Sequence, residues 1–276
     1  MFEKFPDFES IFEEGKKQLL YLKTKAISNA NLDELTPEDK LLFDLVGNMN
    51  IRLNTMLFLL KNNMTDGVSI LERTIFELHI AFVTYSHSKN KSDFVNAYVQ
   101  KSNFEGVRKL MKSSESDVFS SLRESIPNLF ETLSKIKEIS EQNLNGYKKV
   151  NVNKVWYEIA SNSSTFELSK KYLTNPESIY YVGYDEPSNW VHSQRLGENM
   201  DSEFNNKADK NFFPLVIDGI LMAIQWLLDD IAEIALYIHS ELENDLHIYL
   251  KKVIIYGNQV KKLTLNQEIK DGFSNR

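Results

Sequence analysis

Charged side chains interrupt an otherwise apolar segment of the chain, SILERTIFELHIAF, which covers residues 69–82. Arg73 and Glu77 are four residues apart, so on a helix they lie one turn apart on the same face and can form an ion pair. Glu77 and His79 are candidates for burial, and a buried charge needs a partner. Two interpretations stay open: a structural Arg73–Glu77 pair, or a pair that forms one wall of a functional site.

A second cluster of polar and aromatic residues lies downstream, in SIYYVGYDEPSNWVHSQR, residues 178–195. Asp185 or Glu186 can cap a helix that begins at Pro187. Tyrosine and tryptophan rings supply the apolar bodies and polar tips that are typical of ligand sites, although simple aromatic packing gives the same pattern. The candidate ligand-binding residues are Tyr180, Tyr184, Ser188 and Arg195, and Ser188, His192 and Arg195 fall on one helix face.

Several chemistries are excluded because their motifs are missing from the sequence. The chain has no cysteine, its five histidines have no recognised metal-ligand spacing, and its ten glycines form no phosphate-binding loop. Ser188 and His192 lack the nucleophile turn of a serine hydrolase. We therefore expect no metal and no cofactor.

The hydrophobic periodicity is helical throughout and predicts an all-α multi-helix bundle of about eight to ten helices. The most regular segments are separated by an irregular stretch of short helical pieces around 145–210. No linker or repeat divides the chain, so we expect one domain over residues 1–276, with a core at about 37–257 and a frayed tail at 263–276. Helices are expected over 8–28, 37–61, 66–86, 92–113, 117–143 with a bend or interruption at Pro127, 211–241 and 244–259.

Composition and charge narrow the function further. Hydrophobic residues make up 42% of the chain and charged residues 26%, which is typical of a globular protein and not of a disordered one. The missing cysteines and the acidic N-terminal segment indicate a cytoplasmic protein without a signal peptide. Acidic residues within 212–238 argue against a membrane span, and the net charge of −7 argues against broad DNA binding.

The Arg73–Glu77 helix, followed by Ser188-x-x-x-His192, resembles a bacterial all-helical family of unknown function over roughly Leu41 to Glu241. That resemblance implies a context near defence and stress proteins. The spacing of Arg73 and His79 also resembles the HEPN superfamily, whose RNase members carry an arginine and a histidine on one helix and complete the site across a dimer. A polar residue usually follows that arginine, and here it is Thr74.

The HEPN resemblance implies a metal-independent endoribonuclease, with Arg73, Glu77, His79 and His192 as candidate catalytic residues. Arg73 would stabilise the charge on a phosphate, and His79 or His192 would assist attack by a ribose hydroxyl. On this interpretation the expected partners are RNA and a second copy of the chain. The alternative is a non-catalytic helical sensor or interaction module that binds a small ligand or a partner protein, which the acidic charge favours.

Overall fold

The computed structural model describes residues 8–62, 67–114, 121, 124–146, 153–191, 213–238, 246–255, 258 and 262. Within these ranges the chain is helical, and no strand is present. The predicted all-α class and the number of helices are confirmed. Contacts divide the chain into two compact units, Met1–Ser86 with Ser169–Arg276, and His87–Leu168. The prediction of a single domain stays a prediction.

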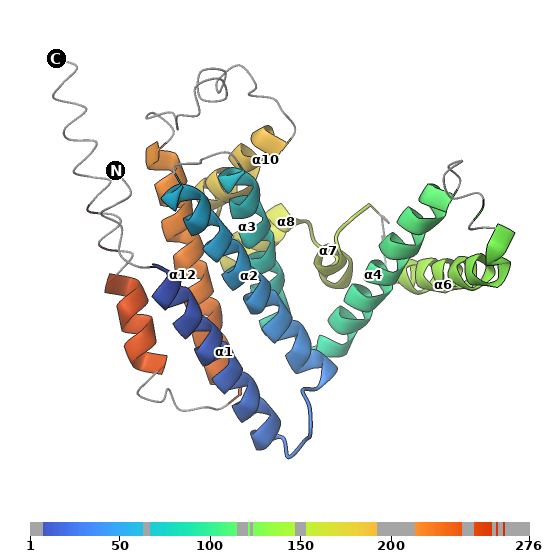
Figure 1. Cartoon of the computed structure of the whole chain (residues 1–276), viewed down its shortest axis with the longest axis horizontal. Helices are drawn as coiled ribbons and strands as arrows, with labels where there is room; N and C mark the ends of the chain where they lie inside the picture. The colour runs from blue at the N-terminus through green and yellow to red at the C-terminus, as the bar shows by residue number, and fades with distance from the viewer. Residues whose placement is uncertain are drawn as a thin grey trace. The chain divides into compact units, whose positions relative to one another are not determined.

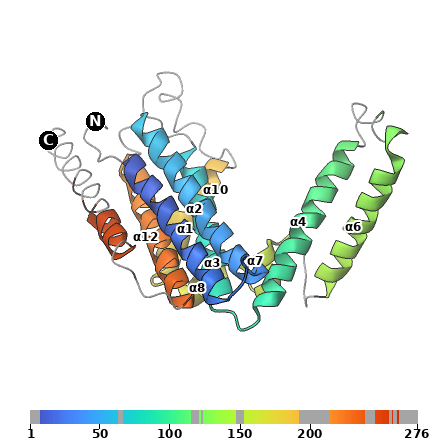
Figure 2. The ribbon, with the colours of Figure 1, turned by 60° about the horizontal axis from the view of Figure 1, so that its bottom comes forward.

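The first unit is a bundle built on a hairpin of two long helices (Figures 1 and 2). The backbone N–H of Asp39 donates to the hydroxyl of Thr36 at 3.0 Å, so the predicted cap and the proline at the first helical position are confirmed. Asn31, in the connection, adopts a left-handed φ of 51°. The helices of the hairpin are α1 (Phe8–Asn29) and α2 (Pro37–Lys61).

Two apolar helices complete this bundle: α3 (Val68–Ser86), which packs on α2, and α12 (Phe213–Tyr237), which packs on both α2 and α3. α3 buries residues on most of its faces, which is the pattern expected of a central helix. The hydroxyl of Tyr85 donates to the carbonyl of Glu38 at 3.0 Å and ties the end of α3 to the start of α2. The functional candidates of α3 therefore lie where α3 packs against α12 and against the chain that begins at Pro176.

That chain is one helical run in three parts: α9 (Pro176–Tyr180), a π-helical segment η2 (Tyr181–Asp185) and α10 (Glu186–Val191). The prediction that a new helix is capped at Asp185 or Glu186 is therefore wrong. Pro187 has no N–H and would collide with the carbonyl four residues before it in a regular helix. The wider π-turn accommodates this proline, and such turns are frequent at functional sites.

The second unit is built on a pair of helices, α4 (Lys91–Ser114) and α6 (Pro127–Asn145), which lie side by side in Figure 2. α6 begins at Pro127, so the predicted interruption there is confirmed as a helix start. The short α7 (Trp156–Ser161) packs against α4, and α8 (Thr165–Tyr172) follows it and continues into the first unit. Four residues form a buried apolar cluster: Ala97, Phe104, Leu144 and Ile159.

None of the described helices is both long enough and apolar enough to cross a membrane. The predicted tail at 263–276 lies outside the described residues, as do residues 192–212.

Candidate functional site

The predicted ion pair of α3 is present. Nε of Arg73 donates to Oε1 of Glu77 at 3.1 Å, and the two side chains are 20% and 31% exposed. Nη2 of Arg73 also donates to the hydroxyl of Tyr184 at 3.2 Å, and the guanidinium carbon lies 4.6 Å from the centre of the Tyr184 ring. Arg73 thus forms an ion pair within α3 and joins α3 to the π-turn through a hydrogen bond and a cation–π contact with Tyr184.

These contacts raise the pKa of the Arg73 guanidinium and so stabilise its positive charge. Partial burial lowers the pKa of Arg73, but the carboxylate of Glu77 and the hydroxyl of Tyr184 together outweigh burial and raise it. Arg73 is cationic at every physiological pH, and Glu77 partly neutralises it. An anion would have to compete with Glu77 for this group.

His79 lies on a different face and has a different partner. Nδ1 of His79 is 3.0 Å from Oδ1 and 3.1 Å from Oδ2 of Asp230 on α12, and both side chains are at most 5% exposed. The indole of Trp226 stacks on the imidazole, with ring centres 5.5 Å apart and an angle of 13° between the planes. The predicted burial of His79 is confirmed, and it faces the interior between α3 and α12.

The carboxyl of Asp230 is fully enclosed, which has an electrostatic consequence. Burial raises the pKa of Asp230 to about 6, and Asp229 and Glu233 act in the same direction, while His79 opposes the shift. Asp230 thus holds its proton at pH values where an exposed aspartate is ionised.

α3 and α12 run in the same direction and meet at two polar positions. Glu72, 5% exposed, lies against Gly219, where a Cβ would overlap its carboxyl group. Two turns further along α3, His79 meets Asp230. Gly219 therefore lets a carboxyl group fit where a larger residue would exclude it. Glu77, by contrast, is only partly buried, so its predicted burial is wrong, and the buried glutamate of α3 is Glu72.

Aromatic rings fill the space between these polar contacts. The centre of the Phe76 ring is 5.5 to 6.0 Å from the ring centres of Tyr180, Tyr184 and Trp226. Gly183 of the π-turn comes so close that a Cβ there would lie 2.8 Å from Phe76 and 3.0 Å from Trp226. Tyr180 and Tyr184 of the predicted aromatic cluster therefore pack onto α3, whereas Tyr181 is 53% exposed.

The remaining predicted site residues are placed as follows. The hydroxyl of Ser188 donates to the carbonyl of Tyr184, within its own helical run. His192 and Arg195 lie outside the described residues. Arg73 and His79 do not meet: six residues turn them about 120° apart on the helix, and Arg73 bonds the π-turn while His79 bonds α12.

The sequence interpretation missed Glu72 as the buried glutamate of α3, and it missed Trp226 and Asp230 as the partners of His79. A signal for Glu72 is its spacing of seven residues from His79, which is two helical turns. Asp230 interrupts the most apolar segment of the chain, and a charge in such a segment indicates a buried partner. Among the residues that the structure describes, no group of three or more acidic or histidine side chains is placed to hold a metal ion.

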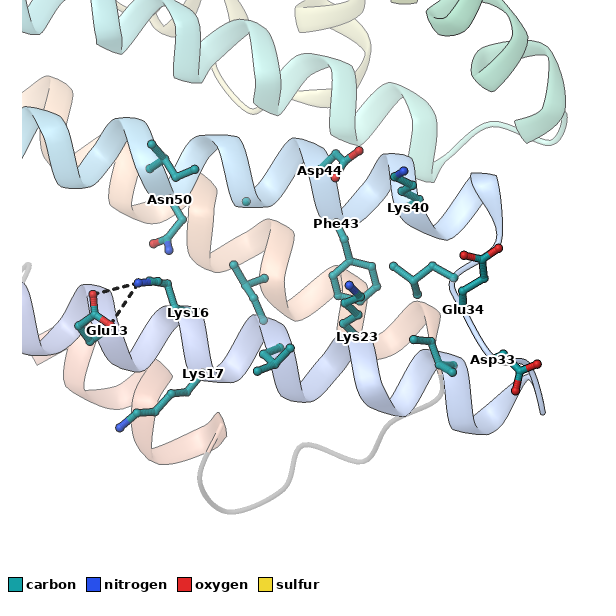
Figure 3. A pocket seen from close by; sticks show the side chains of 16 residues that line it. Glu13, Lys16, Lys17, Lys23, Asp33, Glu34, Lys40, Phe43, Asp44 and Asn50 are labelled. Carbon is teal, nitrogen blue, oxygen red and sulfur yellow. Dashed lines mark hydrogen bonds and ion pairs between the residues drawn. The ribbon is translucent and has the colours of Figure 1, made fainter.

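A second candidate site is an open groove of about 830 Å³ between α1 and α2 (Figure 3). Its apolar lining includes Leu20 and Ile51, whose exposed fractions of 63% and 58% are high for large apolar side chains. Gly47 contributes no side chain, and a Cβ there would meet nothing within 4 Å. The groove is further lined by charged residues of both signs: Glu13, Lys16, Lys17, Lys23, Asp33, Glu34, Lys40 and Asp44.

The chain matches none of the curated proteins and none of the solved structures. A family model, described as a family of unknown function (DUF5677), matches residues 39–208. The match includes most of α2, and α3, the second unit and the run from α9 to α10, and with them the Arg73–Glu77–Tyr184 contacts. The chain therefore belongs to this family of unknown function.

Proposed function

We propose that the protein is a non-catalytic helical interaction module that binds a helix of a partner protein in the groove between α1 and α2. The observation that carries this proposal is the groove itself, which exposes Leu20 and Ile51 along two antiparallel helices. A third amphipathic helix can bury these side chains by packing between the first two. Exposed apolar side chains gathered in a groove are typical of interaction sites.

The contacts of the ionisable residues on α3 support a structural role for them. Arg73 is engaged by Glu77 and Tyr184, and His79 by Asp230 and Trp226. Each of these contacts joins α3 to itself or to a neighbouring element of the same unit. We propose that they hold α3, α12 and the π-turn in register.

The HEPN resemblance supplies the competing proposal, a metal-independent endoribonuclease. It would require the guanidinium of Arg73 and an imidazole to reach the same phosphate. His79 is turned toward Asp230 and cannot take this role. The imidazole would have to come from His192 of the same chain or from a histidine of a second copy. The partial exposure of Arg73, 20%, is the observation that favours this alternative.

Site-specific photo-crosslinking in the cells that make the protein tests the interaction module. A photoreactive amino acid at Leu20 or Ile51 should trap the same partner protein, with the crosslinked residues on one face of one helix. The same amino acid at Leu236, 67% exposed on α12 and outside the groove, is the matched control. A Gly47→Trp substitution, which fills the groove, should abolish the crosslink. Equal trapping at Leu236, or none at either groove position, would refute the proposal.

A nuclease assay on the purified chain separates the two proposals. We expect that wild-type protein and Arg73→Ala do not differ in their action on total RNA. Cleavage that depends on Arg73 would replace the interaction module by the nuclease.

A further inference from the structure

The second unit has an unusual balance of buried and exposed apolar side chains. Within its described residues, nine hydrophobic residues are buried and nine large hydrophobic residues are exposed. The corresponding numbers in the described part of the first unit are thirty and ten. A pair of helices with so small a core needs further apolar contacts to be stable.

Part of this exposed surface follows α6. Ile126 precedes the helix, and Leu129, Ile136 and Ile139 lie on it, with exposed fractions of 44%, 40%, 36% and 55%. Leu129 and Ile136 are seven residues apart, which places them almost in line along the helix. We call these four residues the α6 stripe.

The spacing of the α6 stripe is the same when read from either end. Its steps are three, seven and three residues, so the stripe has its centre between Thr132 and Leu133. A helix that meets a second copy of itself in the antiparallel direction places Leu129 over the partner's Ile136, with Ile126 and Ile139 at the two ends of the contact. Two-fold symmetry requires a self-complementary patch of this kind.

We propose that the α6 stripe is a homodimer interface, in which two copies of α6 pack antiparallel about a two-fold axis near Thr132. Each α4–α6 pair then contributes two helices to a four-helix arrangement, a common architecture for paired helices. This proposal does not depend on the proposed function, because the stripe and the α1–α2 groove belong to different units.

The area of the patch indicates the strength of the dimer. Four partly exposed large side chains make an apolar patch of a few hundred Å², the size that marks interaction sites on soluble proteins. Two such patches with their polar rims reach roughly 1,000 Å², the lower limit for a specific interface. We therefore expect a reversible dimer with a dissociation constant in the micromolar range.

Sedimentation velocity on the full chain tests the dimer. The mass should rise from 32.1 kDa toward twice that value as the concentration passes through the micromolar range. Ile136→Glu should raise the dissociation constant at least tenfold, because the new carboxylate faces the partner's Leu129. Val99→Glu, at an exposed position of α4 outside the stripe, should leave it unchanged. Circular dichroism checks that both variants stay folded.

Disulfide trapping tests the antiparallel register, and the chain suits it because it contains no cysteine. In the proposed dimer, the cysteine of Thr132→Cys lies next to the same cysteine of the second copy, across the two-fold axis. Oxidation should therefore join the two copies by a disulfide. Gln142→Cys lies about 28 Å from its copy in this register, since each residue advances a helix by about 1.5 Å, and should not form one. A chain that stays monomeric at all concentrations overturns the proposal. This outcome is also the one expected if another part of the same chain covers the stripe. A dimer that Ile136→Glu leaves unchanged, or equal trapping at both cysteines, overturns this interface.

Discussion

Nδ1 of His79 and Oδ1 of Asp230 lie 3.0 Å apart between α3 and α12, and both side chains are buried. The contact connects segments that are 151 residues apart in the sequence. Two ionisable groups in an apolar interface cost free energy unless they satisfy each other. The pair thus fixes how α3 and α12 face one another.

The first prediction concerns the pH dependence of this contact. The pKa of Asp230 is about 6 in the folded chain, above its ordinary value of 3.8. The unfolded chain therefore releases this proton first, and the stability that the protonated carboxyl contributes is lost as the pH rises from about 4 to about 6. Relative to Asp230→Asn, which cannot ionise, the wild type should lose about 2 kcal/mol of unfolding free energy over this range.

Urea denaturation of both proteins at several pH values between 4 and 7 measures the difference. Asp44→Asn, at an exposed position of α2, serves as the control and should follow the wild type. A wild type that gains stability over the variant as the pH rises would mean that His79 lowers the pKa of Asp230 below 3.8, and the prediction would be wrong.

Two glycine substitutions should act in opposite directions. Gly219→Ala places a methyl group against the buried carboxyl of Glu72 and should lower the free energy of unfolding by about 1–3 kcal/mol. Gly47→Ala, in open space on α2, should raise it by about 0.5–1 kcal/mol because alanine restricts the unfolded chain and favours helix. Thermal denaturation of the two variants provides the comparison. Equal effects would contradict the close approach of α12 to Glu72.

A double-mutant cycle should show that the Arg73–Glu77 ion pair is weak. Both side chains are partly exposed and lie four residues apart on one helix, so we expect a coupling free energy of about 0.5 kcal/mol. Arg73→Ala should cost about 1 kcal/mol more than Glu77→Ala, because it also removes the cation–π contact with Tyr184. In a Tyr184→Leu background this excess should disappear. An excess that persists there would place the contribution of Arg73 elsewhere.

The helices and the local pairs were predictable because their signals are local. The cap at Thr36, the start at Pro127 and the Arg73–Glu77 pair each depend on residues within four positions of one another. The partners of His79 were not predictable, since the sequence does not say which distant segment a helix face meets. The π-turn was missed for a related reason: a proline usually marks a helix start, but here the chain stays helical through Pro187, next to Gly183, which approaches the distant rings of Phe76 and Trp226.

Core substitutions can decide whether the two compact units unfold separately. Leu144, fully buried, packs in the cluster of the second unit, and Leu144→Ala should cost about 2–5 kcal/mol there. If that unit opens by itself, amide hydrogen exchange should accelerate in α4 and α6 while α3 and α12 keep their protection. Ile80→Ala, at a fully buried position of α3, is the matched control and should accelerate exchange in α2, α3 and α12. Faster exchange in all helices of both variants would instead show that the chain unfolds as one cooperative domain, which is what the uninterrupted sequence predicts.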